Sequence, residues 1–317
     1  MLFKILKIDK SKDSRIFYWM RTFALLAVVM SHANYILPKS EFVKQLLSSF
    51  LISGVAVFLF AGGAYWKRRT VKQTLLSVIK ILPCWFIFGS LIYSISAIKT
   101  GFSIVNWVYY LVGKNTYLWY LTIYVIIQFL FCLKFMGNKA SLLMCIIVTF
   151  ISRIVVTCYG ISGYEAFLNP LNWIGFFALG IYIRQYNQTD KISISERIGL
   201  VVVVIISINI FALLNVNFNS IRFDYWTYFG PFMQCAWIII IYHLSVILSN
   251  LHGFEIGKSS LVIYLLHMPF IGFVTNRLKL NCFFAFLISI LVILLIFVIT
   301  FLFNKIILYL TEKSQAI

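Results

Sequence analysis

Long apolar segments recur along this chain, and short polar segments separate them. Between Ile16 and Leu310 a new apolar segment begins roughly every 25 to 30 residues. Most of these segments approach the roughly 20 residues that an α-helix needs to cross a lipid bilayer. The pattern therefore predicts an all-α fold, a polytopic integral membrane bundle of transmembrane helices.

The pattern predicts about ten transmembrane helices. One of them, 171–184, is short for a span, so we expect it to tilt or to include flanking residues. A further segment, 104–112, is too short to span and contains Trp and Tyr, which predicts an interfacial position. The ten predicted helices cover residues 16–37, 46–66, 74–97, 117–136, 140–159, 171–184, 198–215, 228–249, 259–276 and 282–304.

The composition supports a membrane protein and excludes an ordinary soluble domain. Of the 317 residues, 62% are hydrophobic and only 11% are charged, whereas soluble domains carry about 25% charged residues. No segment has the composition of a separate soluble domain. Residues 1–317 are therefore interpreted as a single membrane domain.

The net charge of +18 comes mainly from Lys and Arg in the loops of one side. This asymmetry is typical of the cytoplasmic side of a membrane protein, and it accounts for the charge better than nucleic-acid binding does. The basic N-terminal segment 1–15 is predicted to be cytoplasmic, and an even number of spans returns the tail 305–317 to the same side. We therefore expect a multi-pass protein of the inner (plasma) membrane, in contact with membrane lipid and without a nucleic-acid partner.

Two polar side chains, Arg21 and His32, bracket the apolar part of the first predicted helix. A separation of eleven residues is three helical turns plus about 20°, so both side chains share one helix face, with a rise of about 16 Å between them. An arginine inside a span costs about 2.5–3.5 kcal/mol and needs a partner or a hydrated cavity. The aligned pair therefore predicts a polar channel inside the bundle. Alternatively, Arg21 extends to the inner headgroups and His32 lies at the outer interface.

The same helix carries a recognisable motif, because Arg21, ten intervening residues and His32 form the pattern R-X10-H. This pattern resembles membrane-bound acyltransferase family three, the O-acyltransferases that modify bacterial polysaccharides. Further stretches resemble the family in the same order over nearly the whole chain, although the usual Ser-Gly of its second helix appears here as Gly62-Gly63. These stretches are GVAVFLFAGGAYWKRR (54–69), KILPCWFIFGSLIYSI (80–95), YLWYL (117–121), WIGFFALGIYI (173–183) and GKSSLVIYLLHMPF (257–270).

The resemblance implies an integral-membrane O-acyltransferase. Its acyl group, expected to be acetyl, would come from coenzyme A in the cytoplasm and pass to a hydroxyl of an envelope, capsule or exopolysaccharide sugar, on a lipid-linked or growing glycan. His32 would act as the base or carry the acyl group transiently, since imidazole suits proton transfer near neutral pH. Arg21 would hold an anionic part of the donor or orient the His32 end of the channel. Acetyl-CoA is then a co-substrate, and no tightly bound cofactor and no metal are expected.

A basic segment, Lys67, Arg68 and Arg69, directly follows the second predicted helix. It is interpreted either as an ordinary topology anchor or, in the family context, as a binding site for the phosphates of the acyl donor.

A second intramembrane charge, Arg153, lies near the middle of the fifth predicted helix, where extension to the headgroups is hardest. Its expected partner is Glu165 at the outer edge or the acceptor itself. The alternative is a structural hydrogen bond to the carbonyls of a broken helix.

Three further residues are candidates for contacts with the channel or the acceptor. Tyr264 and His267 are three residues apart and share a helix face. A hydrogen-bonded histidine between helices is the simpler interpretation of His267, and direct chemistry is the second. Trp119 is interpreted first as a residue of the interfacial aromatic belt and second as a surface on which substrate stacks.

Two rival functions remain open at the level of sequence. A transporter or flippase for a glycan or an acylated small molecule would line its path with Arg21 and Arg153. A structural partner in an envelope assembly would need no buried base. No clear internal repeat supports the transporter interpretation.

Overall fold

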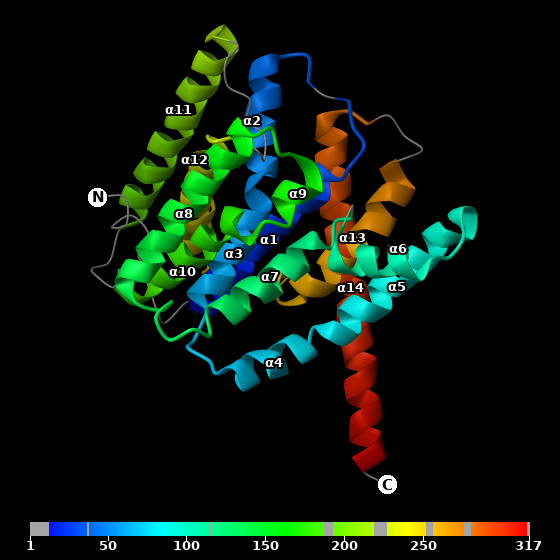
Figure 1. Cartoon of the computed structure of the whole chain (residues 1–317). Coiled ribbons are helices and arrows are strands. Elements are labelled where there is room, and N and C mark those ends of the chain that lie inside the picture. Colours follow the sequence, from blue (N-terminus) through cyan, green and yellow to red (C-terminus); the bar gives the residue numbers. More distant parts are fainter. Residues whose placement is uncertain are drawn as a thin grey trace.

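The computed structural model describes residues 13–36, 38–114, 116–186, 193–218, 227–251, 256–275 and 280–315. These residues form an all-α membrane bundle, and the only β pairing among them is an isolated bridge between Tyr35 and Leu280. The helices are arranged around a buried centre, as Figure 1 shows. The predicted fold class is therefore confirmed.

Fourteen α-helices and two short 3-10 helices are described in this chain. Each of the ten predicted segments coincides with one or two of them. The elements are α1 (Asp13–Ser31), α2 (Glu41–Leu51), α3 (Ser53–Ala64), α4 (Val71–Ile79), α5 (Leu82–Thr100), α6 (Ile104–Val112), α7 (Trp119–Leu130), α8 (Lys139–Cys158), α9 (Gly163–Phe167), η2 (Pro170–Asn172), α10 (Ile174–Tyr186), α11 (Ile194–Phe218), α12 (Gly230–Leu248), η3 (Ile256–Ser259), α13 (Ser260–Thr275) and α14 (Cys282–Gln315).

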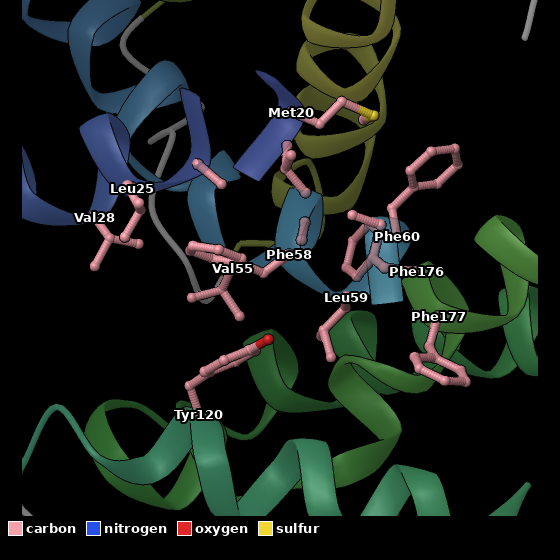
Figure 2. Close-up of a cluster of buried hydrophobic side chains, with 14 of the residues drawn as sticks. Met20, Leu25, Val28, Val55, Phe58, Leu59, Phe60, Tyr120, Phe176 and Phe177 are labelled. Atoms are coloured by element: carbon pink, nitrogen blue, oxygen red, sulfur yellow. The ribbon is translucent and has the colours of Figure 1, made fainter. Parts of the chain in front are cut away.

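Helix α3 is the centre of the bundle, and all of its residues are buried. Its sequence, SGVAVFLFAGGA, combines small residues, which let neighbouring backbones approach, with large apolar residues that fill the remaining space. Helices α1, α2, α10 and α12 pack around it. Figure 2 shows this core: Tyr120 of α7 points toward Val55 and Phe58 of α3, while Phe177 of α10 lies near Leu59.

The contact between α3 and α10 depends on glycine. A Cβ atom on Gly63 would overlap the carbonyl oxygen of Phe177, and one on Gly180 would overlap the carbonyl oxygen of Phe60. The two helices therefore touch backbone to backbone, as small-residue contacts in membranes allow. Gly62, by contrast, faces the ring of Tyr124, 3.1 Å from the position of an added Cβ.

The helix that the sequence predicts over 46–66 is broken at Ile52, between α2 and α3. Gln234 of α12 donates a hydrogen bond of 2.9 Å to the Ile52 carbonyl, and Trp237 donates one of 3.0 Å to Ser49 Oγ. Gln234 of α12 therefore satisfies a backbone carbonyl at the break, as burial requires, and Trp237 ties the end of α2 to α12. Together, the two helices form one apolar span, Phe42–Ala64.

The helix predicted over 74–97 is likewise two helices, α4 and α5, bent by 41° at their junction. Pro83 in the first turn of α5 accounts for the break, because proline cannot continue a preceding helix. The predicted segment 104–112 forms α6, which has no buried residue. The indole nitrogens of Trp85 and Trp107 donate hydrogen bonds of 3.0 Å between α5 and α6.

The predicted number of ten spans is not confirmed. Among the described residues, five helices, or six if α4 and α5 form one bent span, are long and apolar enough to cross a membrane. Helices α7 and α10 have 12 and 13 residues, or about 18–20 Å, against about 30 Å of hydrocarbon. Much of α7 and most of α10 is buried. These helices can be short because the bundle, rather than lipid, surrounds them.

Helix α14 is longer than predicted. It continues past residue 304 to Gln315, so most of the predicted tail 305–317 extends the last helix. In Figure 1 this end of α14, in red, projects beyond the other helices.

Candidate active site

Arg21 lines a cavity inside the bundle. The cavity has a volume of about 230 Å³ and lies between α1, α3, α7 and the start of α13. Arg21 is half-buried, and its guanidinium lies 5.4 Å from the centroid of the Tyr65 ring. The lining residues are Arg21, Phe58, Gly62, Ile81, Tyr120, Leu121, Tyr124, Lys258, Ser260, Leu261 and Tyr264.

The cavity is electropositive. Arg21 and Lys258 belong to its lining, and none of the described lining residues is acidic. A third cation lies close by, because the guanidinium of Arg184 is 5.7 Å from the Tyr65 ring and donates a hydrogen bond of 2.6 Å to the Ala64 carbonyl. This arrangement favours an anionic ligand or an anionic part of one.

Lys258 reaches the cavity because η3 packs tightly against α1. A Cβ atom on Gly257 would overlap the carbonyl oxygen of Tyr18, so the backbone of η3 lies directly on α1. The ammonium of Lys258 is 5.3 Å from the centroid of the Tyr18 ring. Two cations distant in sequence, Arg21 and Lys258, therefore line the same cavity.

His32 lies just beyond the end of α1, in a turn, and its side chain is exposed. The His267 ring of α13 is fully buried, with its centroid 5.2 Å from that of His32. Tyr117 completes the cluster, at centroid distances of 6.5 Å from His32 and 5.2 Å from His267. The pair of imidazoles thus lies where the protein interior meets the accessible surface.

Hydrogen bonds between side chains and backbone carbonyls hold this cluster together. Tyr117 donates a hydrogen bond of 2.7 Å to the Leu265 carbonyl, which Pro269 cannot satisfy because it has no N–H. Tyr264 donates from its hydroxyl to the Tyr117 carbonyl. His267 Nδ1 lies 2.5 Å from the Tyr264 carbonyl oxygen.

Tyr264 connects the cavity to the histidine cluster. It lines the cavity with Arg21, and its ring lies 5.6 Å from His267 and 5.8 Å from Tyr117. Arg21 and His32 therefore both face α13, with Arg21 beside α7 and His32 beside Tyr117, just before α7 begins. Arg21 lines a cavity within the bundle, where the sequence predicted a polar channel.

Two side chains of the basic segment after α3 lie near different cavities. Lys67 and Arg68 are exposed, and Arg69 is partly buried. Arg68 lines a second cavity of about 370 Å³ together with Trp66, Lys134, Asn138 and Tyr186, among others. Arg69 instead lies within electrostatic range of the Tyr124 hydroxyl, which places it toward the Arg21 cavity.

Arg153 belongs to a separate cluster. It is fully buried, its guanidinium lies 4.5 Å from the Trp173 ring centroid, and it donates a hydrogen bond of 3.3 Å to the Asn172 carbonyl. This is the contact with carbonyls that the sequence allowed as one alternative. Glu165 is exposed on α9.

Trp119 also belongs to this separate cluster. Its ring stacks on Phe167 at 4.5 Å and lies 5.1 Å from Trp173. The side chain is buried, so the interpretation of Trp119 as a belt residue at the lipid interface is wrong. The reason is that α9 and η2 cover the start of α7.

Several residues of the site carry little signal in the sequence. In the sequence, Lys258 looks like an ordinary loop cation. Only the packing of η3 on α1 brings it to the cavity that Arg21 lines. Tyr117, Tyr120 and Tyr124 are spaced three and four residues apart, which places them on one face of the α7 region. That spacing is the signal that could have identified them.

Comparison with known proteins identifies the family. No curated protein and no solved structure matches the chain. A family model described as an acyltransferase domain, acyltransferase family 3, matches residues 16–308, nearly the whole chain. The match includes α1 with Arg21 and His32 and α13 with Tyr264 and His267. This chain therefore belongs to acyltransferase family 3, and it is a membrane acyltransferase of that family.

Proposed function

We propose that this protein moves an acyl group, acetyl in the simplest case, from coenzyme A to a hydroxyl of an envelope, capsule or exopolysaccharide sugar. One observation carries the proposal: Tyr264 joins an electropositive cavity at Arg21 to an accessible histidine at the other end of α1. The two ends are separated by about 16 Å of helix rise. Such an arrangement suits a donor and an acceptor that approach from opposite sides.

The cavity supports donor binding. Coenzyme A carries phosphates, and Arg and Lys side chains bind phosphate through charge-assisted hydrogen bonds. Arg21 and Lys258 supply such cations in the cavity itself. Arg68 and Lys134 supply two more in the second cavity, where Trp66 offers an aromatic ring for the nucleotide end of the donor.

The exposure of His32 supports its role as the base. A sugar hydroxyl must reach the imidazole, and the side chain of His32 is exposed whereas that of His267 is not. In the reaction, His32 takes the hydroxyl proton while the oxygen attacks the thioester carbonyl. The carbon–sulfur bond then breaks, the sugar ester is released, and the proton leaves with the coenzyme A thiolate as a thiol.

Acetyl transfer in isolated membranes tests this function. Membranes with the wild-type chain should consume labelled acetyl-CoA and transfer the label to envelope glycan, adding the mass of one acetyl group. In His32→Ala the rate should fall by about 10²–10⁴-fold, the range of general-base catalysis, with normal membrane insertion. Lys258→Met should instead raise the donor KM.

Two controls sharpen the test. His243→Ala replaces a histidine of α12 that, unlike His32, is fully buried and contacts Arg197 at 3.3 Å; it should leave the rate per folded protein unchanged. Lys305→Met removes an exposed cation of α14 and should leave the donor KM unchanged. Glycan movement across the membrane without use of acetyl-CoA would favour a flippase and refute the proposal.

A further inference from the structure

One ring nitrogen of His267 has no hydrogen-bond partner among the described residues. The ring is fully buried, and its Nδ1 lies 2.5 Å from the Tyr264 carbonyl oxygen. A carbonyl only accepts, so Nδ1 carries the hydrogen and, in the neutral ring, Nε2 carries a lone pair. Nε2 has no protein partner. An unpaired buried acceptor is destabilising, so we expect Nε2 to receive a hydrogen bond from a donor during catalysis.

His32 is the neighbour that can supply that donor. The two ring centroids are 5.2 Å apart, and rotation about the side-chain torsions can bring ring nitrogens so spaced to about 3 Å. The two nearby hydroxyls are already engaged, because Tyr117 donates to the Leu265 carbonyl and Tyr264 donates to the Tyr117 carbonyl. Hydrogen bonds in catalytic sites often tighten only with substrate bound.

We propose that His267 is a positioning residue, whose Nε2 accepts a hydrogen bond from one ring N–H of His32. This inference rests on the proposed function of His32 as the base. The hydrogen bond fixes the tautomer of His32, so that its other nitrogen presents a lone pair to the acceptor hydroxyl. In this arrangement His32 is the base and a third group orients it, as in other catalytic sites. The orienting group is the neutral imidazole of His267, which the backbone of α13 holds in place.

The same hydrogen bond acts during the reaction. When His32 takes the hydroxyl proton, it becomes a positively charged imidazolium with two N–H groups. One of them remains bound to His267 Nε2, which stabilises the charge. The other returns its proton to the coenzyme A thiolate as the thioester breaks. Both imidazoles are neutral at the end, so the cycle needs no further reactant.

Two amide substitutions separate this role from a structural one. His267→Gln can place its carbonyl oxygen near the position of Nε2 and so keep the acceptor. His267→Asn keeps an amide donor for the Tyr264 carbonyl but has no acceptor at the Nε2 position. We expect kcat for acetyl transfer to fall at least about 10²-fold in His267→Asn, with the KM for acetyl-CoA unchanged, and to stay within about threefold of wild type in His267→Gln.

Each result has a defined meaning, with rates normalised to folded protein in the membrane. Equal activities of the Asn and Gln variants, or a better Asn variant, would overturn the inference, because a structural role needs only the donor at Nδ1. A loss that appears in the donor KM would also overturn it. His243→Asn controls for a buried histidine outside the site and should match wild type. Absence of acetyl transfer by the wild-type chain would overturn the proposed function, and the inference with it.

Discussion

At the scale of single residues, Pro269 shows how one side chain prepares the site from a distance. Within α13 it cannot donate to the Leu265 carbonyl, four residues earlier. The Tyr117 hydroxyl takes that place, at 2.7 Å. This hydrogen bond holds Tyr117 against His267. The carbonyl that Pro269 leaves unpaired in the helix therefore helps to position the histidine cluster.

A double-mutant cycle tests this compensation. Tyr117→Phe should lower the free energy of unfolding by about 1–3 kcal/mol, because the buried Leu265 carbonyl loses its partner. In a Pro269→Ala background the same change should cost less than about 1 kcal/mol, since the new N–H of residue 269 can bond that carbonyl. Thermal unfolding of the purified protein in detergent measures both steps. Equal costs in the two backgrounds would show that the hydroxyl does not replace the missing N–H.

At the scale of elements, α3 contributes both to the cavity and to the close contact with α10. The adjacent residues Gly62 and Gly63 have different neighbours, since Gly62 lines the cavity near Tyr124 and Gly63 lies on the backbone of Phe177. These different neighbours explain the Ser-Gly pair that is usual in the family at this place. The first position can hold a hydroxyl that faces the cavity, whereas the second needs glycine for the helix contact.

Substitutions at the two positions should therefore differ in their effect on stability. Gly62→Ser needs only a small shift of the Tyr124 ring and should change the unfolding temperature little. Gly63→Ala forces α3 and α10 apart, because its methyl group would overlap backbone atoms, and should cost about 3 kcal/mol or more. The two variants are compared by heating the detergent-solubilised proteins and measuring the fraction that stays folded. Similar stabilities would argue against the close contact of α3 with α10.

At the scale of the whole molecule, the two ends of α1 differ in charge and in exposure. The Arg21 end lines an electropositive cavity, and the side chain at the His32 end is exposed. The charge asymmetry of the loops predicts that the Arg21 end lies nearer the cytoplasm. The donor and acceptor sides of the proposed reaction follow from this orientation.

Thiol labelling tests the orientation directly. Asn34 and Arg68 are both exposed and flank the Phe42–Ala64 span at opposite ends. In a variant without the six native cysteines, a membrane-impermeant thiol reagent added outside intact cells should label Asn34→Cys but not Arg68→Cys. In inside-out vesicles the labelling should reverse. The opposite pattern would invert the topology and remove the cytoplasmic donor from the proposal.

The sequence by itself determined the membrane location, the helical segments and the placement of Arg21 and His32 on one side of α1, because these depend on apolar run length and on the local period of a helix. It also carried the family motif. The number of spans, by contrast, did not follow from length alone, because α7 and α10 are short and largely buried in the bundle.

Only the tertiary structure decided which faces meet. It brought Lys258 to Arg21 through the packing of η3 on α1, and it set His267 beside His32. It also gave Arg153 the Asn172 carbonyl and the Trp173 ring as contacts. The physical reason is that helix periodicity fixes a residue's direction relative to its own helix. The neighbour in that direction is fixed by close packing between segments that are separate in the sequence.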